Sequence, residues 1–260
     1  MSETRNHRLS RFLVVIGRVY CLGDPNIRAR LRSFHCRQML RRFHPLRILD
    51  AGCGRSGQLG WFGGIAPIAY SLSRQFLEAE VVGLDRDHEI GRHNQECASR
   101  GRIQNLEFFT RSIEGGESLG RFDVVVFSDI ARDSDRDGQL LQNVSGLVAP
   151  GGVLLVICPS TERLVWHRWP KWVSSGTGFD AESISRVLAG SGLKVRNIRR
   201  ILGLSGALAA EASDRISKLA YPLLVLLFPF LMTCGVLEAC GSISRGETLL
   251  VAATRAADER

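Results

Sequence analysis

The sequence predicts an α/β fold built on a doubly wound, mostly parallel seven-stranded sheet. From residue 47 onward, short apolar runs alternate with longer helical segments, which is the pattern of parallel strands joined by helices. The runs are almost continuously apolar, as is typical of strands buried on both faces. Several of them end in a glycine turn, and the connections between parallel strands are expected to be right-handed.

Seven segments carry the strand pattern. They are residues 47–52, 80–85, 105–110, 121–130, 153–159, 194–202 and 246–254. Helices are expected between them, over roughly 58–79, over 139–148 and over 180–193. The helix at 139–148 is expected to stop at Pro150-Gly151-Gly152, and the helix at 180–193 has an N-cap aspartate, Asp180, and a stop signal at Gly192.

The segment ahead of the sheet, residues 26–43, has apolar residues on two sides of a helix. Ile27, Leu31 and Phe34 share one side, and Cys36, Leu40 and Phe43 lie nearly opposite. A helix packed on both sides would have this pattern, and so would two short helices.

Positive charge is concentrated at the start of the chain. The whole chain carries a formal charge of +8, but residues 1–47 contain eleven arginines and only two acids, Glu3 and Asp24. The other residues are therefore close to neutral. A polyanionic partner, if there is one, is expected to meet this N-terminal arm. A solvated helix is the alternative interpretation.

Seven cysteines occur without a C-x-x-C pair, so neither a metal cluster nor a disulfide framework is expected. We interpret them as reduced thiols of a cytoplasmic protein. The apolar run near the N-terminus is cut short by Arg18 and no small-residue cleavage site follows it, so a secretory signal is not expected.

The stretch LDAGCGRSGQLG at residues 49–60 fits two cofactor sites. Gly52, Gly54 and Gly57 have the spacing of a dinucleotide-binding turn, whereas Asp50 two residues before Gly52 is typical of an adenosyl-methionine turn. A carboxylate at Asp50 would repel a pyrophosphate and attract the cationic amino group of adenosyl-methionine. Asp85 ends the second predicted strand, 28 residues beyond Gly57, instead of the roughly 20 usual for a dinucleotide site.

With these motifs the chain resembles the class I S-adenosylmethionine-dependent methyltransferases over about residues 44–255. The matching strings are ILDAGCG, VVGLDRD, FDVVVFSD, LVAPGGVLLV and DAESISRVLAGSGLKV. The resemblance implies the Rossmann-like methyltransferase fold, with S-adenosyl-L-methionine as cofactor. We expect four parts: a basic N-terminal helical arm (1–43), a cofactor-binding core (44–202), an apolar helical insertion (203–245), and the last strand with a tail (246–260).

The same resemblance implies the cofactor contacts. The methionine part would lie along Asp50, Gly52, Cys53 and Gly54. Asp85 would bind the ribose. The adenine would lie beside Arg86, Ser112 and Ile113, and the sulfonium beside Ser128. The chain departs from the family pattern at three points. Ser56 replaces the third glycine of the motif, the interval from Asp50 to Asp85 is longer than usual, and Ala131-Arg132-Asp133 replaces the family's Leu-Glu-His.

The acceptor is less well defined. His167, in VWHRWPKW, is the one histidine beyond the fifth predicted strand, so it is a candidate general base; an ordinary polar residue of that loop is the alternative. An Asn/Asp-Pro-Pro-aromatic string is absent after the fourth strand, which disfavours adenine-N6 methylation. Cys158 is interpreted as a packing residue and not as a nucleophile for cytosine methylation.

Residues 219–237 carry no charge over 19 residues, which is close to the length of a membrane span. Three interpretations stay open: a buried helix pair over the acceptor pocket, a surface that dips into the lipid interface, or a true span. We expect a hydrophobic or lipid-linked acceptor, methylated on oxygen, and a peripheral contact with anionic membrane on its cytoplasmic face. The alternatives are a non-catalytic module, an RNA methyltransferase recruited by the arm, and an NAD-dependent oxidoreductase.

Overall fold

The computed structural model describes residues 27–54, 67–113, 119–128, 136–161, 178–219, 221–240 and 246–257. Its core is one seven-stranded sheet with the order β3-β2-β1-β4-β5-β7-β6. The strands are β1 (Arg47–Ala51), β2 (Glu80–Asp85), β3 (Leu106–Thr110), β4 (Phe122–Ser128), β5 (Val148–Pro159), β6 (Leu193–Ile201) and β7 (Thr248–Arg255). All pairs are parallel except those of β7, which runs antiparallel to both of its neighbours. The predicted fold class is confirmed.

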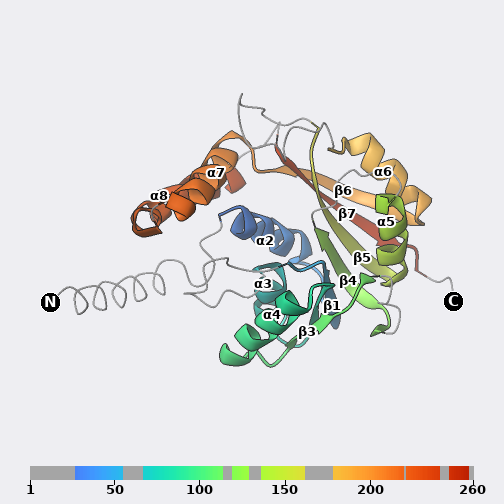
Figure 1. The fold of residues 1–260 in the computed structure, drawn as a ribbon. Coiled ribbons are helices and arrows are strands. Elements are labelled where there is room, and N and C mark those ends of the chain that lie inside the picture. The colour runs from blue at the N-terminus through green and yellow to red at the C-terminus, as the bar shows by residue number, and fades with distance from the viewer. Residues whose placement is uncertain are drawn as a thin grey trace.

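Helices cover both faces of the sheet (Figure 1). They are α2 (Ile27–Leu40), α3 (Pro67–Gln75), α4 (His88–Arg100), α5 (Arg136–Gly146), α6 (Ala181–Gly190), α7 (Leu204–Leu219) and α8 (Tyr221–Cys240). Alternate residues of each strand point to opposite faces, so β1 sends Ile48 into the core under α2, α3 and α4 and Leu49 into the core under α5 and α6.

The helix α2 joins two hydrophobic clusters. Cys36 and Leu40 pack on the sheet, whereas Ile27 and Leu31 pack on α7 and α8. In Figure 1, α2 accordingly lies between the sheet and the α7–α8 pair. The two-sided apolar pattern of residues 26–43 is therefore that of one helix packed on both sides, and not of two short helices.

The predicted stop at Pro150-Gly151-Gly152 is wrong. The helix α5 already ends at Gly146, and these three residues belong to β5, which begins at Val148. Gly151 adopts a φ of 75°, a conformation that glycine tolerates without strain. The pairing of β4 with β5 shifts register at the same point, so the turn residues form an irregular start of the strand.

The α7–α8 pair lies at the edge of the sheet where the parallel strands end. Because β5 and β6 both run antiparallel to β7, β6 is parallel to β5 and its carboxyl end lies at the same edge as those of β1, β4 and β5. The chain leaves β6 at Ile201, forms α7 and α8, and returns into β7. Among the helices of the described residues, none is long and apolar enough to cross a membrane.

Candidate active site

The glycine turn follows β1 at the carboxyl edge of the sheet. Gly52 and Gly54 adopt φ angles of 73° and 66°, which place both in the left-handed region that other residues avoid. The backbone N–H groups of Gly52 and Cys53 both donate to the carbonyl oxygen of Leu84 in β2, at 2.8 and 3.0 Å. The turn therefore bends sharply over the end of the neighbouring strand, and a Cβ atom at either glycine would meet no atom of the described residues within 4 Å.

Asp85, the last residue of β2, holds this turn. Its Oδ2 atom accepts a hydrogen bond from the N–H of Gly54 at 2.9 Å, and its Oδ1 atom accepts one from the N–H of Asp87 at 3.0 Å. An ionised carboxylate offers about four acceptor positions, so two backbone donors leave it able to accept further hydrogen bonds from a ligand. The side chain is partly exposed.

Asp50 lies one strand away and is almost fully buried, at 1% exposure. Its Oδ2 atom accepts a hydrogen bond from the N–H of Ala69 at 3.0 Å, in the first turn of α3. A carboxylate at this position compensates the partial positive charge of a helix N-terminus. Asp50 thus fixes the start of α3 at the same time as it brings a negative charge under the glycine turn.

The two carboxylates act together on the residue between the glycines. Burial raises the pKa of the Cys53 thiol, and the negative charges of Asp50 and Asp85 raise it further. Beside these two carboxylates a further negative charge is disfavoured and a cation is favoured. This electrostatic property suits a sulfonium or ammonium group and opposes a pyrophosphate.

A buried amide on α4 completes the support of the turn. Asn94 is fully buried, and its Nδ2 atom donates to the carbonyl oxygen of Gly54 at 2.9 Å and lies 3.8 Å from the sulfur of Cys53. Sequence reasoning missed this residue, because nothing in the α4 sequence marks one polar residue as the one that faces the turn.

The other predicted cofactor residues lie at the ends of their strands. Arg86 and Ser112 are exposed beyond β2 and β3, Ile113 packs partly against the core, and Ser128 is the last residue of β4. All therefore lie at the carboxyl edge, with the glycine turn. His167 lies outside the described residues.

Arg32 of α2 is a second residue that sequence reasoning missed. Its positive charge lowers the pKa of the thiols of Cys36 and Cys158, although burial dominates and raises both to about 12. Cys158 is the second-to-last residue of strand β5, at the carboxyl edge. The helix α2 thus brings a guanidinium to the sheet edge that holds the two carboxylates.

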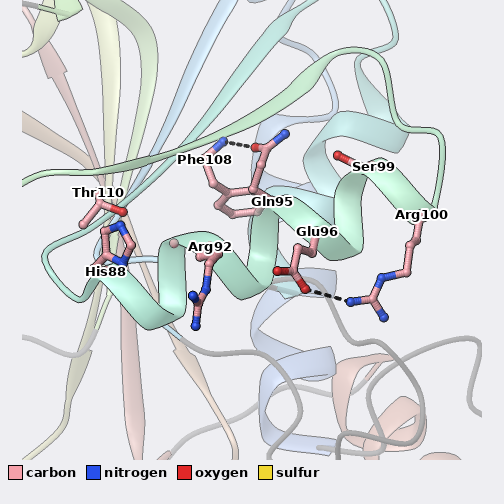
Figure 2. Close-up of a pocket in the computed structure, with 9 residues that line it drawn as sticks. His88, Arg92, Gln95, Glu96, Ser99, Arg100, Phe108 and Thr110 are labelled. Atoms are coloured by element: carbon pink, nitrogen blue, oxygen red, sulfur yellow. Dashed lines mark hydrogen bonds and ion pairs between the residues drawn. The ribbon is translucent and has the colours of Figure 1, made fainter.

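A separate groove of about 630 Å³ runs between α4 and the edge strand β3 (Figure 2). Figure 2 shows Gln95 accepting a hydrogen bond from the N–H of Phe108 and Glu96 paired with Arg100. Asn94 and the glycine turn do not line this groove. Because the side-chain oxygen of Gln95 accepts this N–H group of the edge strand β3, the group is not available for pairing with a strand of another chain.

Comparison with known proteins identifies the family. A family model described as a methyltransferase domain matches residues 44–185. No curated protein sequence matches the chain significantly.

Solved structures share the fold at low sequence identity. An O-methyltransferase family protein from Burkholderia thailandensis has a TM-score of 0.54 and 15% identity, and the match covers 90% of this chain and 59% of that one. The N-methyltransferase NodS from Bradyrhizobium japonicum WM9, in complex with S-adenosyl-L-homocysteine, has a TM-score of 0.52 and 14% identity, covering 87% of this chain and 86% of that one. The [4+2]-cyclase SpnF has a TM-score of 0.55 and 14% identity, covering 87% of this chain and 80% of that one.

These likenesses concern the fold alone, and the cyclase illustrates that one fold can serve different reactions. The chain spans about 59% of the length of the Burkholderia protein. The family model, in contrast, matches more than half of this chain, and the negative charge around the glycine turn agrees with it. The chain therefore belongs to the methyltransferase-domain family, and its cofactor is S-adenosylmethionine.

Proposed function

We propose that the chain transfers the methyl group of S-adenosylmethionine to a small hydrophobic or lipid-linked acceptor, preferentially to oxygen, at the cytoplasmic face of a membrane. The position of α7 and α8 is the main support for this choice of acceptor. These helices are inserted after β6, at the sheet edge where the glycine turn lies, and α8 is apolar along almost its whole length. An apolar acceptor would reach the methyl group across such a surface.

The cofactor residues of the proposal follow from their positions. Asp85 would accept the ribose hydroxyls with its remaining acceptor positions, and Asp50 with the turn from Gly52 to Gly54 would face the methionine part. Arg86, Ser112 and Ile113 would contact the adenine, and Ser128 would lie beside the sulfur. Arg32 carries the charge that a methionine carboxylate needs as its partner. The bound cofactor supplies an electrophilic methyl group on a positively charged sulfur.

The protein then has to align the acceptor and keep water away from it. An oxygen acceptor must also lose a proton to a base. His167 remains our candidate for that base, with another polar residue of the 162–177 segment as the alternative. An amine acceptor that is already neutral would need no such base, so the acceptor atom and the base are tested together.

Label transfer from the cofactor tests the proposal. The purified protein is incubated with cell extract and methyl-labelled S-adenosylmethionine, and the label is separated into lipid, nucleic acid and aqueous small molecules. We expect most of the label in the lipid fraction, and none with an Asp85→Ala variant. Label in nucleic acid would favour an RNA methyltransferase guided by the arginine-rich arm, and label only in aqueous compounds would refute an apolar acceptor.

The acceptor atom is tested on the labelled product. A methyl ether withstands mild acid and carries no titratable nitrogen, whereas a methylated amine binds to a cation exchanger at low pH. Retention of the product on the exchanger would refute oxygen as the acceptor. If His167 is the base, His167→Gln is expected to lower kcat with little change in the affinity for S-adenosylmethionine.

A further inference from the structure

We propose that the outer face of α8 is a docking surface for the interface of an anionic lipid bilayer, on which the protein lies without crossing it. The proposal makes one part of the proposed function specific, namely the membrane contact, and names the residues that form it. Lipid docking does not depend on the identity of the acceptor, so the two can fail separately.

The face is a stripe of exposed large apolar side chains. Leu223, Leu226, Phe230 and Leu237 are all exposed. At about 100° per residue they fall within about 60° of the helix circumference, over a length of about 21 Å. We call these four residues the α8 stripe.

The opposite side of α8 is already covered by protein. Phe228 and Leu231 are buried in the cluster formed with α2 and α7. A Cβ atom at Gly235 would lie only 3.0 Å from the side chain of Leu31, so α2 and α8 approach closely there. The helix α8 is apolar on all sides, but only one side has a protein partner within the described residues. Exposure of the α8 stripe to water is therefore unfavourable, and contact with an apolar surface would stabilise it.

A bilayer fits the stripe better than a second copy of the chain does. Four side chains of this size, each partly covered, offer on the order of 500 Å², whereas a stable protein interface buries about 800 Å² per partner. The stripe is also the convex surface of a helix, to which fluid acyl chains can adapt without a complementary groove. Helices that lie in the lipid interface bury such a face by about 5–10 Å.

The distribution of charge specifies an anionic surface. Four of the eleven arginines of residues 1–47 lie in α2, which contains no acidic residue; they are Arg28, Arg30, Arg32 and Arg37. Ile27 and Leu31 of the same helix pack in one cluster with Phe228 and Leu231 of α8, so a basic helix lies beside the apolar helix. Within the described part, the guanidinium of Arg30 lies 5.3 Å from the ring centre of Phe228 in α8. Cations beside an apolar surface strengthen binding to anionic lipids.

The test measures binding of the full-length protein to vesicles. Vesicles of phosphatidylcholine with about 30% phosphatidylglycerol are compared with pure phosphatidylcholine by flotation. The wild type is expected to float with the anionic vesicles at low salt and to be released as salt is raised. The variant Leu226→Asp plus Phe230→Asp should bind at least about tenfold more weakly, and Leu226→Ala plus Phe230→Ala should show an intermediate loss without added charge.

The chain offers a matched control on the opposite side of the molecule. Leu77 and Leu46 are 76% and 69% exposed, close to the 75% of Leu226 and the 67% of Phe230. Leu46 directly precedes β1 and Leu77 lies three residues before β2 begins, so both lie at the amino edge of the sheet, away from α8. Leu46→Asp plus Leu77→Asp adds the same two charges and should bind vesicles like the wild type.

Three results would overturn the proposal. The first is a wild type that does not float with anionic vesicles at low salt. The second is equal flotation of the α8 and the control variants. The third is a wild-type dimer that the α8 variant converts to a monomer while vesicle binding is absent, which would make the stripe a contact between copies. All variants should bind S-adenosyl-L-homocysteine equally well in calorimetry. If the protein binds vesicles but transfers label only to aqueous products, the lipid acceptor is refuted and the docking surface is retained.

Discussion

The carboxylate of Asp85 accepts a hydrogen bond from the backbone N–H of Gly54 at 2.9 Å, so the end of β2 holds the turn that follows β1. The same carboxylate accepts the N–H of Asp87, at the start of α4. One side chain thus fixes two loops of the candidate cofactor site, and its negative charge lies beside the turn. This double role makes Asp85 the first residue to test.

The variant Asp85→Asn should lower the affinity for S-adenosylmethionine by about tenfold, which corresponds to the loss of one hydrogen bond to a charged group. Affinity for S-adenosyl-L-homocysteine, whose sulfur is neutral, should fall less, because the removed charge no longer favours a cation. Calorimetry with both ligands gives the ratio of the two dissociation constants. Asp87→Asn is the control, since asparagine also caps a helix, and it should leave the ratio unchanged. An unchanged ratio in Asp85→Asn would show that the carboxylate does not sense the sulfonium.

Gly54→Ala separates backbone strain from ligand contact. Both Gly54 and Gly151 have positive φ angles, 66° and 75°, and a Cβ atom at either would meet no atom within 4 Å in the part of the chain that the structure describes. Alanine should therefore lower the free energy of unfolding by about 1–2 kcal/mol at both positions. Only Gly54→Ala should also abolish binding of S-adenosylmethionine, because its methyl group would occupy the open side of the turn. Equal binding by the two variants in calorimetry would remove the turn from the cofactor site.

Most of the sheet could be predicted from the sequence because the signal is local. A buried parallel strand is an apolar run, and runs such as that of β4 can be recognised without knowing their partners. The start of β5 could not be predicted, since Pro150, Gly151 and Gly152 are turn residues that the strand accommodates with a positive φ and a register shift. That outcome depends on pairing with β4, which lies far away in the sequence.

The positions of the candidate site residues were predictable only in part. Asp50, Asp85 and the two glycines stand at strand ends, and strand ends can be read from the sequence. Asn94 and Arg32 contribute through the direction in which a helix presents one side chain, and that direction depends on tertiary packing. The burial of His35 in the interface of α2 also depends on tertiary packing. The sequence alone does not show which residues of a helix packed on two sides are excluded from water.

Asn94→Ala tests the support of the turn from α4. It removes the donor to the carbonyl oxygen of Gly54, so it should destabilise the protein by about 1–3 kcal/mol and weaken binding of S-adenosylmethionine several-fold. Asn105→Ala is matched, because the Nδ2 atom of Asn105 lies within hydrogen-bond distance of three carbonyl oxygens at the end of α3, away from the turn. It should cost similar stability in thermal melts and leave the affinity intact. If both variants bind the cofactor equally well, Asn94 has only a structural role.

His35 should make stability depend on pH. It is buried at 2% exposure, its Nδ1 atom has no hydrogen-bond partner among the described residues, and burial, with the nearby charge of Arg199, lowers its pKa to about 4 from an ordinary 6.5. Below pH 6.5 the unfolded chain takes up a proton at this residue that the folded chain does not, so stability falls as the pH is lowered from 6.5 to 4. The loss attributable to His35 should approach about 3 kcal/mol at pH 4.

Urea unfolding at several pH values measures this loss. Other groups also titrate between pH 6.5 and 4, so the informative quantity is the difference between the wild type and His35→Leu, which should be less sensitive to acid in that window. His44→Leu, which replaces an exposed histidine, should keep the wild-type dependence. If His35→Leu and the wild type lose stability in parallel, His35 is not kept neutral in the folded protein. Water would then reach this side chain between α2 and the sheet.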